Sequence, residues 1–308
     1  MSEGFWAVLG YGVLNVLLAL AAAPLCEGIV RKITARIQSR KGPPLRQPYY
    51  DLLKLLGKED IEAGESPRMQ RMAAYLSLGA TLTLAALVPM GGTAPLDGWA
   101  DAILLVYLLT LCGVSTLLAG LAAGSPYSLI GASRSMMTML TLEPILAVAV
   151  IIGAIEARSL RLDAILGASL FSGLGWPLAG LVMLGVMLLA LQAFVERVPF
   201  DVGEAETEIM EGALVEYSGP KLALFKYARM VRLFVYCALV VTLFSPLGRG
   251  WVFPLALLAF LAQTLVLVLL VTLIGATHAR YRIDQAIRYF AVLLAVSVGA
   301  LALAAVGF

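Results

Sequence analysis

Eight long apolar segments separated by short polar connections dominate the hydrophobic pattern of this 308-residue chain. Each is about long enough to cross the ~30 Å hydrocarbon core of a bilayer as a helix. They cover residues 5–25, 72–90, 100–122, 138–155, 174–195, 230–247, 251–276 and 286–307. The pattern predicts an all-α integral membrane protein of about eight transmembrane helices, with both termini on the same side of the bilayer.

Composition supports the same fold class, since 61% of the residues are hydrophobic and only 14% are charged. A soluble domain of this length cannot bury so much apolar surface, so the surplus is expected to face lipid.

The N-terminus, Met1-Ser2-Glu3-Gly4, has no basic residue before its apolar run, and no small-residue cleavage site follows. We therefore expect the first span to be retained rather than removed as a signal peptide.

Basic residues gather in alternate connections, which predicts the orientation of the chain. Nineteen of the 22 lysines and arginines lie in residues 26–71, 123–137, 196–232 and 277–288. We expect the protein to lie in the inner (cytoplasmic) membrane of the cell. The positive-inside rule then places these connections in the cytoplasm and both termini outside. We predict one membrane domain over residues 1–308, with cytoplasmic loops at 26–71, 123–137, 196–229 and 277–288.

The basic loop at 26–71 carries two candidate helical features. Arg36 and Arg40 are four residues apart, which predicts one shared helical face before Gly42-Pro43-Pro44 breaks the helix. Residues 49–56 then place leucines in a helical stripe beside Asp51 and Lys54, which predicts an amphipathic helix along the membrane surface. The simpler alternative is a loop that only sets topology and contacts anionic lipid.

Carboxylates are concentrated in residues 196–216, against Arg197 as the one basic residue there. The acids are Glu196, Asp201, Glu204, Glu206, Glu208, Glu211 and Glu216. Asp201 followed by Glu204 predicts a capping box, and on the resulting helix Glu204, Glu208 and Glu211 would share one face. Carboxylates that lie close together raise one another's pKa, which a site that takes up and releases protons requires. The alternative is a solvated polar loop.

Glu143 lies inside an apolar span, directly before Pro144. An ionised carboxylate there costs roughly 2.5–3.5 kcal/mol on insertion scales, so such a residue is functional by default. Pro144 donates no backbone hydrogen bond and loosens the helix beside the acid. The alternative is a protonated glutamate that is hydrogen-bonded within the helix bundle.

Cysteine and histidine usage argues against a redox centre in this chain. Cys26, Cys112 and Cys237 are isolated from one another in apolar surroundings, and His278 is the only histidine. This pattern fits neither a Cys-x-x-Cys metal site nor a multi-histidine haem or zinc site. We expect the cysteines to be small packing residues.

Three stretches together carry a resemblance to a known family. They are Ala35-Arg36 to Pro44 with Asp51 to Leu55 and Lys58-Glu59; Gly131 to Arg134 with Glu143; and Pro199-Phe200-Asp201 through Glu216-Tyr217-Ser218-Gly219. The chain resembles the H-type membrane subunit of respiratory complex I and its homologues in group 4, energy-converting nickel-iron hydrogenases. The segment from Glu208 to Gly212 looks like the hydrogenase branch, which includes formate hydrogenlyase, and the stretch 224–229 lacks the glutamate typical of complex I.

The resemblance implies a membrane protein that holds no cofactor itself and does no bond chemistry alone. Its expected partners are the hydrogenase large and small subunits and a ferredoxin-like subunit, which would carry the iron-sulfur clusters and the nickel-iron centre, together with antiporter-like membrane subunits; no nucleic acid is expected. The implied proton path comprises Glu143, Glu196, Asp201, Glu204, Glu206, Glu208, Glu211 and Glu216. The implied docking residues are Arg36, Arg40, Arg134, Asp51, Lys54 and Glu59.

Three other functions remain open from the sequence. The chain resembles complex I closely enough to be its H-type membrane subunit, lining a quinone chamber, although the departure at 224–229 weakens the case for quinone binding. The second alternative is a stand-alone ion transporter, and the third is a passive anchor whose acidic residues only solvate an interface. The sequence does not distinguish protons from sodium as the coupled ion, nor formate, carbon monoxide or ferredoxin as the electron source.

Overall fold

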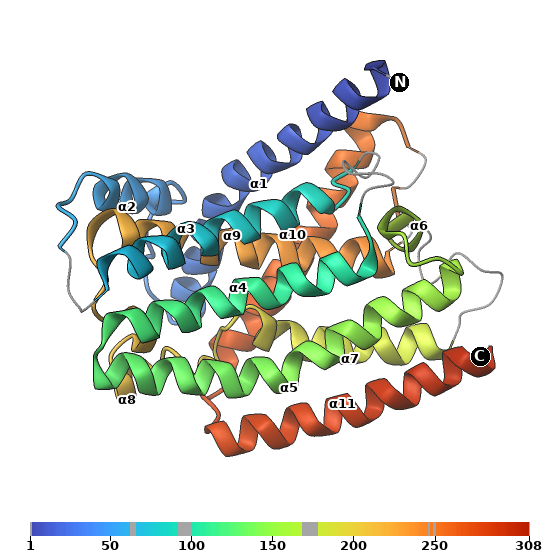
Figure 1. Cartoon of the computed structure of the whole chain (residues 1–308). Helices are drawn as coiled ribbons and strands as arrows, with labels where there is room; N and C mark the ends of the chain where they lie inside the picture. Colours follow the sequence, from blue (N-terminus) through green and yellow to red (C-terminus); the bar gives the residue numbers. More distant parts are fainter. Residues whose placement is uncertain are drawn as a thin grey trace.

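The structure, a computed structural model, describes residues 2–61, 66–91, 100–167, 178–245, 247–248 and 251–307. Within these ranges the regular elements are helical (Figure 1). They are α1 Ser2–Ile37, α2 Gln47–Leu56, α3 Pro67–Leu87, α4 Ala102–Ala123, α5 Pro126–Ala157, α6 Leu162–Gly167, α7 Leu178–Phe194, α8 Glu206–Ile209, the 3-10 helix η1 Gly212–Leu214, α9 Gly219–Phe244, α10 Phe253–Thr277 and α11 Ile283–Val306.

Each of the eight expected spans overlaps a helix of 17 residues or more, and residues 174–177 and 246 of these spans lie outside the described ranges. Six described helices, α1, α4, α5, α9, α10 and α11, are long and apolar enough to cross a membrane. The seventh, α7, is a shorter apolar helix, and α3 has 21 residues with arginines in its first turns. The chain is therefore an all-α, multi-pass membrane protein, as the hydrophobic pattern predicted.

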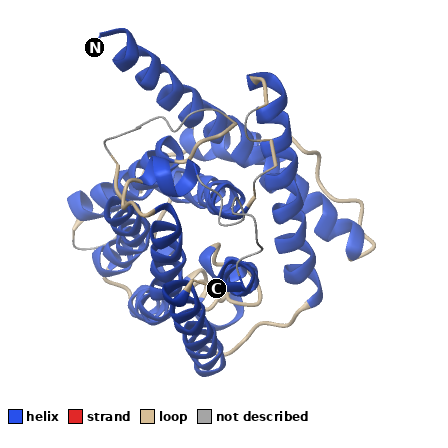
Figure 2. Ribbon diagram, turned by 90° about the vertical axis from the view of Figure 1, so that its right-hand side faces the viewer, coloured by secondary structure: helices blue, strands red, loops and turns tan. Residues whose placement is uncertain are grey.

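The long helices run side by side as a bundle whose two ends differ (Figures 1 and 2). Both termini and α6 lie at one end, whereas α2 and α8 lie at the other. We call the second end the loop end. It carries the segment between α7 and α9, residues 195–218, which we call the acidic loop.

Helix α9 forms the centre of the bundle. It contacts α1, α2, α3, α7 and α10, and 89% of its most apolar stretch is buried inside the protein. Its buried face is largely aliphatic and aromatic, yet the helix also carries four buried or half-buried basic residues, Lys221, Lys226, Arg229 and Arg232. Charged groups at the centre of the bundle require partners, and these partners come from the neighbouring elements.

Three helices extend well beyond the spans that hydrophobicity predicted. Helix α1 continues to Ile37, α5 begins at Pro126 instead of 138, and α9 begins at Gly219 instead of 230. The connection expected at 123–137 is thus mostly the first turns of α5. Hydrophobicity alone ends a span at its first charged residues, whereas the helices continue because these charges form ion pairs with other elements.

The shared helical face predicted for Arg36 and Arg40 is wrong. Helix α1 ends at Ile37 in a Schellman motif, with Ser39 in the left-handed region at φ 58° and Arg40 N–H donating to the Ala35 carbonyl at 2.7 Å. Arg40 therefore lies outside the helix. Both arginines are exposed at the loop end.

The predicted amphipathic helix at 49–56 is present as α2. Leu52 is buried against the bundle, whereas Tyr50, Leu53 and Leu56 are exposed. An exposed apolar stripe at one end of a membrane protein fits a helix that lies on the membrane surface or against another subunit.

Candidate ion pathway

The acidic loop does not form the helix that the sequence predicted. Asp201 and Glu204 lie in irregular backbone, α8 is only four residues long, and both Met210 and Glu211 adopt left-handed conformations that end it. The predicted shared face of Glu204, Glu208 and Glu211 is consequently wrong. Glu204 turns into the protein while Glu208 turns out of it, because each carboxylate meets a different arginine.

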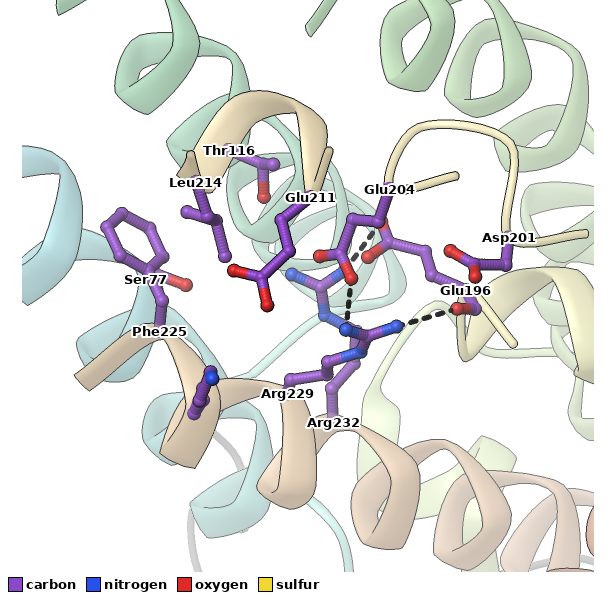
Figure 3. A pocket seen from close by; sticks show the side chains of 11 residues that line it. Ser77, Thr116, Glu196, Asp201, Glu204, Glu211, Leu214, Phe225, Arg229 and Arg232 are labelled. Atoms are coloured by element: carbon purple, nitrogen blue, oxygen red, sulfur yellow. Dashed lines mark hydrogen bonds and ion pairs between the residues drawn. The ribbon is translucent and has the colours of Figure 1, made fainter. Parts of the chain in front are cut away.

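Arginines of α9 reach up into the acidic loop from below (Figure 3). Arg229 forms an ion pair with Glu204, and its guanidinium also donates to the Glu196 carbonyl at 3.2 Å. Arg232 pairs with the Glu196 carboxylate at 2.7 Å, and its side chain is only 7% exposed. A third pair, Arg280–Asp201 at 2.9 Å, holds the loop from the connection before α11. These pairs replace the helical hydrogen bonds that the sequence pattern favoured.

The end of α7 places Glu196 above α9. A second Schellman motif closes this helix, with Glu196 at φ 53° and Arg197 N–H donating to the Gln192 carbonyl at 3.2 Å. The turn sends the two side chains to different partners. Glu196 pairs with Arg232, while Arg197 pairs with Glu27 of α1.

Glycines hold the acidic loop close to α5. A Cβ built on Gly131 would lie 2.6 Å from Gly212 Cα, and one on Gly212 would lie 2.1 Å from the Gly203 carbonyl oxygen. Gly212 also has φ 54°, a conformation in which side chains are strained. The backbones therefore approach closely only because these three positions have no side chain.

The Glu-Tyr-Ser-Gly stretch fixes the start of α9 to distant elements. Tyr217 Oη donates to the Ala119 carbonyl of α4 at 3.0 Å, and Lys221 pairs with Asp60 at 3.2 Å. Gly219, at φ 55°, packs against the backbone of Glu59. This motif thus joins the α2–α3 connection to the central helix, so its role among the described residues is structural.

Three cavities lie in series between the loop end and Glu143. The largest, about 410 Å³, is the vestibule, and the side chain of Arg31, which lines it, is 37% exposed. The second, the inner cavity of about 90 Å³, lies between the acidic loop and α9. The third, the Glu143 cavity of about 50 Å³, lies among α4, α5, α7 and α9. Each exceeds the roughly 10–15 Å³ that one water molecule requires.

Neighbouring cavities share the side chains at their junctions. Asp201, Glu211, Lys226 and Arg229 line both the vestibule and the inner cavity. Glu196 and Arg232 line both the inner cavity and the Glu143 cavity. A row of polar groups consequently leads from the loop end to a carboxyl group inside an apolar span.

Glu143 itself lies in α5 and is half-buried. Its Oε1 atom has no hydrogen-bond partner among the described residues, and the cavity beside it is also lined by apolar side chains such as Leu109, Leu146 and Phe194. An orphaned carboxyl oxygen beside a cavity is the arrangement expected of a group that exchanges a proton with water.

Burial separates the acids of the loop into two kinds. It raises the pKa of Asp201 and of Glu204 in spite of nearby arginines. In contrast, a hydrogen bond from Arg134 at 2.5 Å lowers the pKa of Glu208, which is exposed. Asp201 and Glu204 therefore hold a proton more readily than an ordinary carboxyl group does, whereas Glu208 holds one less readily.

The implied proton-path residues do not all come together. Glu143, Glu196, Asp201, Glu204 and Glu211 line the three cavities. Glu208 lies instead in a separate cavity of about 220 Å³ with Arg134 and Arg280, and Glu216 lines none of these spaces. The side chain of Glu206 lies outside the described part of the chain.

The implied docking residues lie at the loop end but differ in accessibility. Arg36, Arg40, Lys54 and Glu59 are exposed. Asp51 accepts hydrogen bonds from Arg31 at 2.8 Å and Gln47 at 2.9 Å, and Arg134 pairs with Glu208. The first four are therefore accessible to a partner, whereas Asp51 and Arg134 also have roles within the protein.

Sequence reasoning missed six charged residues that line the pathway. They are Glu27, Arg31, Arg197, Lys226, Arg229 and Arg232. Arg229 and Arg232 are three apart at the start of an apolar run, and an ionisable residue in a span is a functional candidate by default. The sequence therefore contained this signal. It was missed because the cytoplasmic loop that begins at residue 196 was predicted to extend to 229–232, and both arginines were counted as loop residues.

Metal binding finds no support in the described residues, where no group of three or more His, Cys, Asp or Glu side chains is placed to hold an ion. The three cysteines are free and buried. They lie in α1, α4 and α9 as packing residues.

Comparison with known proteins gives the chain its relatives. It is 34% identical to Hydrogenase-4 component C of Escherichia coli (strain K12), over 90% of this chain and 87% of that protein. It is 33% identical to Formate hydrogenlyase subunit 4 of the same organism, over 89% and 91%. It is also 33% identical to NADH-quinone oxidoreductase subunit 8 of Rhodothermus marinus, over 78% and 73%.

Structural comparison agrees with these relatives. A chain of the membrane-bound sulfane sulfur reductase, an archaeal respiratory membrane complex, superposes with a TM-score of 0.87 at 28% identity, over 97% of this chain and 99% of that one. The NADH dehydrogenase family model matches residues 10–305. The chain therefore belongs to the NADH dehydrogenase family, and its relatives include both a hydrogenase component and an NADH-quinone oxidoreductase subunit.

Proposed function

We propose that this chain is the membrane-anchoring and ion-coupling subunit of an energy-converting nickel-iron hydrogenase complex. It docks a soluble electron-transfer arm at the loop end and passes redox energy to ion movement through the membrane. Hydrogenase-4 component C and Formate hydrogenlyase subunit 4 support the hydrogenase assignment. The hydrogenase large and small subunits, a ferredoxin-like subunit and antiporter-like membrane subunits are the proposed partners, with every redox cofactor in the arm.

The observation that carries this proposal is the shared lining of the three cavities. A proton that enters the vestibule meets Asp201 and Glu211, then Glu204 and Glu196, and reaches Glu143 through groups that face the same water-sized spaces. Protonation of Glu204 or Glu196 weakens its pair with Arg229 or Arg232, because a neutral carboxyl attracts a guanidinium less strongly. Charge changes at the loop end are thereby transmitted to Glu143.

Docking at the loop end follows from the distribution of charge and apolar surface. Nineteen basic residues were assigned to this side by sequence, and Arg36, Arg40 and Lys54 lie at the surface there beside the apolar stripe of α2. We place this end in the cytoplasm and both termini outside. Such a surface attracts an acidic partner and retains it through apolar contacts.

Glu143→Gln tests the ion path, since glutamine keeps the size and hydrogen bonding of the side chain but does not titrate. We expect the complex to assemble and to pass electrons to an artificial acceptor, while proton uptake per electron falls at least about tenfold, because a lost proton relay typically costs 10²–10⁴ in rate. Uptake is followed in sealed vesicles with a pH-sensitive dye, alongside hydrogen production.

The matched control is Glu156→Gln, which makes the same change at an exposed position of the same helix. This variant should pump as the parent does. Normal pumping per electron in Glu143→Gln would remove Glu143 from the pathway, and quinone reduction in place of hydrogen evolution would contradict the hydrogenase assignment.

Reversal of Arg36 and Arg40 to glutamate tests docking separately. Like charges across an interface cost several kcal/mol, so the double variant should lose the arm during purification in mild detergent. Reversing Arg158 and Arg161, exposed at the other end of the bundle, should leave the arm bound. An intact, active complex after the first reversal would rule out docking through these arginines.

A further inference from the structure

Basic side chains stand at both junctions of the cavity series. Lys226 and Arg229 line the passage between the vestibule and the inner cavity, and Arg232 lines the passage between the inner cavity and the Glu143 cavity. The vestibule is lined by three carboxylates and four basic side chains, which are Glu27, Asp201, Glu211, Arg31, Arg197, Lys226 and Arg229. Pathways that select metal cations show the reverse, with rings of Asp and Glu.

Most carboxylates along the route already have a guanidinium as partner. Glu196 pairs with Arg232, Glu204 with Arg229, and Asp201 with Arg280. A sodium ion would have to displace these guanidinium groups to use the same oxygens. Each displaced guanidinium would then be left without its partner in a largely buried site, which is costly.

Protons and sodium ions differ in what they need from such a route. Hard metal cations such as Ca²⁺ or Mg²⁺ take about six or more oxygen ligands, and sodium likewise requires several oxygens to replace its water. A proton requires one oxygen atom, on which it forms an O–H bond and neutralises the carboxylate. Waters and carboxyl groups that face shared cavities provide the single oxygen that a proton requires, but not the set of oxygens that a sodium ion requires.

We infer that Lys226, Arg229 and Arg232 determine ion specificity by excluding sodium from the route to Glu143, so that the ion relayed through this chain is the proton. The inference rests on the proposed ion path and names its ion. Raised proton affinity of the buried Asp201 and Glu204 carboxyls agrees with it. Sodium carried by a neighbouring subunit would not touch this route.

Chemical labelling of Glu143 tests the inference within this chain. A carbodiimide modifies protonated carboxyl groups, and mass spectrometry of the purified complex measures the extent at Glu143. Labelling should fall as pH rises and stay unchanged when choline is replaced by sodium at constant ionic strength. A bound sodium ion at ten times its Kd would leave about one-tenth of the sites open to label.

A charge reversal at the first junction provides the second measurement. Lys226→Glu gives the vestibule four carboxylates and three basic side chains, so sodium should now compete with protons and slow proton uptake several-fold. Lys58→Glu makes the same change at an exposed residue that lines none of the three cavities and should stay insensitive to sodium.

The possible outcomes separate this inference from the proposed function. Sodium protection of Glu143 in the parent, no labelling of Glu143 at any pH, or sodium-insensitive uptake in Lys226→Glu would each overturn the inference. Normal pumping in Glu143→Gln would overturn the ion path itself. Sodium protection combined with lost pumping in Glu143→Gln would leave the path in place and make sodium its ion.

Discussion

Helices α9 and α11 are both apolar enough to cross a membrane, yet they occupy opposite environments. In α9, 89% of the most apolar stretch is buried, whereas in α11 only 22% is buried. Mean hydropathy runs the other way, at 1.6 for α9 and 2.4 for α11. The peripheral helix is the more apolar one because it meets lipid, which offers no partner for a polar group.

The central helix α9 can carry polar groups because it does not face lipid. Its neighbours are side chains, and Arg229 and Arg232 find carboxylates there. A moderately apolar span among strongly apolar spans thus indicates the interior of the bundle and the site of function. Three experiments can break or sharpen this contrast between centre and periphery.

Removing a charge from α9 should have the largest effect. Arg232→Met leaves Glu196 without its partner, and breaking a buried pair costs about 3–5 kcal/mol, reduced here because the Glu196 side chain is 34% exposed. We expect the thermal unfolding temperature of the detergent-solubilised complex to fall clearly. Adding Glu196→Gln should restore much of it, since the uncompensated carboxylate is then gone.

The control for the periphery is Arg288→Met, the same substitution at an exposed position of α11. Its unfolding temperature should stay near that of the parent, because exposed charges contribute little. Equal losses in Arg232→Met and Arg288→Met would contradict the contrast between the two helices.

A single methyl group provides the next test. Gly131→Ala places a Cβ 2.6 Å from Gly212 Cα, so α5 and the acidic loop must separate, at about 1–3 kcal/mol for overpacking. Gly299→Ala in α11 meets no atom within 4 Å and should be neutral, or stabilising by up to about 1 kcal/mol through helix propensity. Comparing thermal unfolding of the two variants measures the difference; an undisturbed Gly131→Ala would mean that the loop is not held by close backbone contact.

The pH dependence of two acidic-loop residues should be the smallest effect, and of opposite sign. The pKa of Glu208 is lowered by Arg134, so its contribution to stability is present above the ordinary glutamate pKa and lost as pH falls through the lowered value. The pKa of Glu204 is raised by burial, so its contribution is present below the ordinary pKa and lost as pH rises through the raised value.

Arg134→Gln should therefore reduce stability near neutral pH and not in acid, whereas Glu204→Gln should remove a loss of stability that the parent shows on raising the pH. Unfolding temperatures of both variants and the parent across the acidic-to-neutral range provide the measurement. The same sign for the two variants would mean that Glu204 is solvated like Glu208.

The sequence predicted the spans well because a lipid-facing helix must be apolar along its length, and that requirement is visible residue by residue. It also singled out Glu143, since a carboxylate in an apolar run is unusual. It failed for Glu204 and Glu208, whose spacing favours one helical face. Their directions depend on Arg229 and Arg134, which lie 25 residues after and 74 residues before them in the chain. Local pattern carries no information about such partners.

The order of the paired residues along the chain matters during membrane insertion. An arginine at the centre of a span opposes insertion by roughly 2.5–3.5 kcal/mol, and α9 carries two. Their carboxylate partners, Glu196 and Glu204, precede them in the chain and are therefore already synthesised when α9 leaves the ribosome. The acidic loop thus places the counter-charges of both arginines ahead of α9 in the order of synthesis.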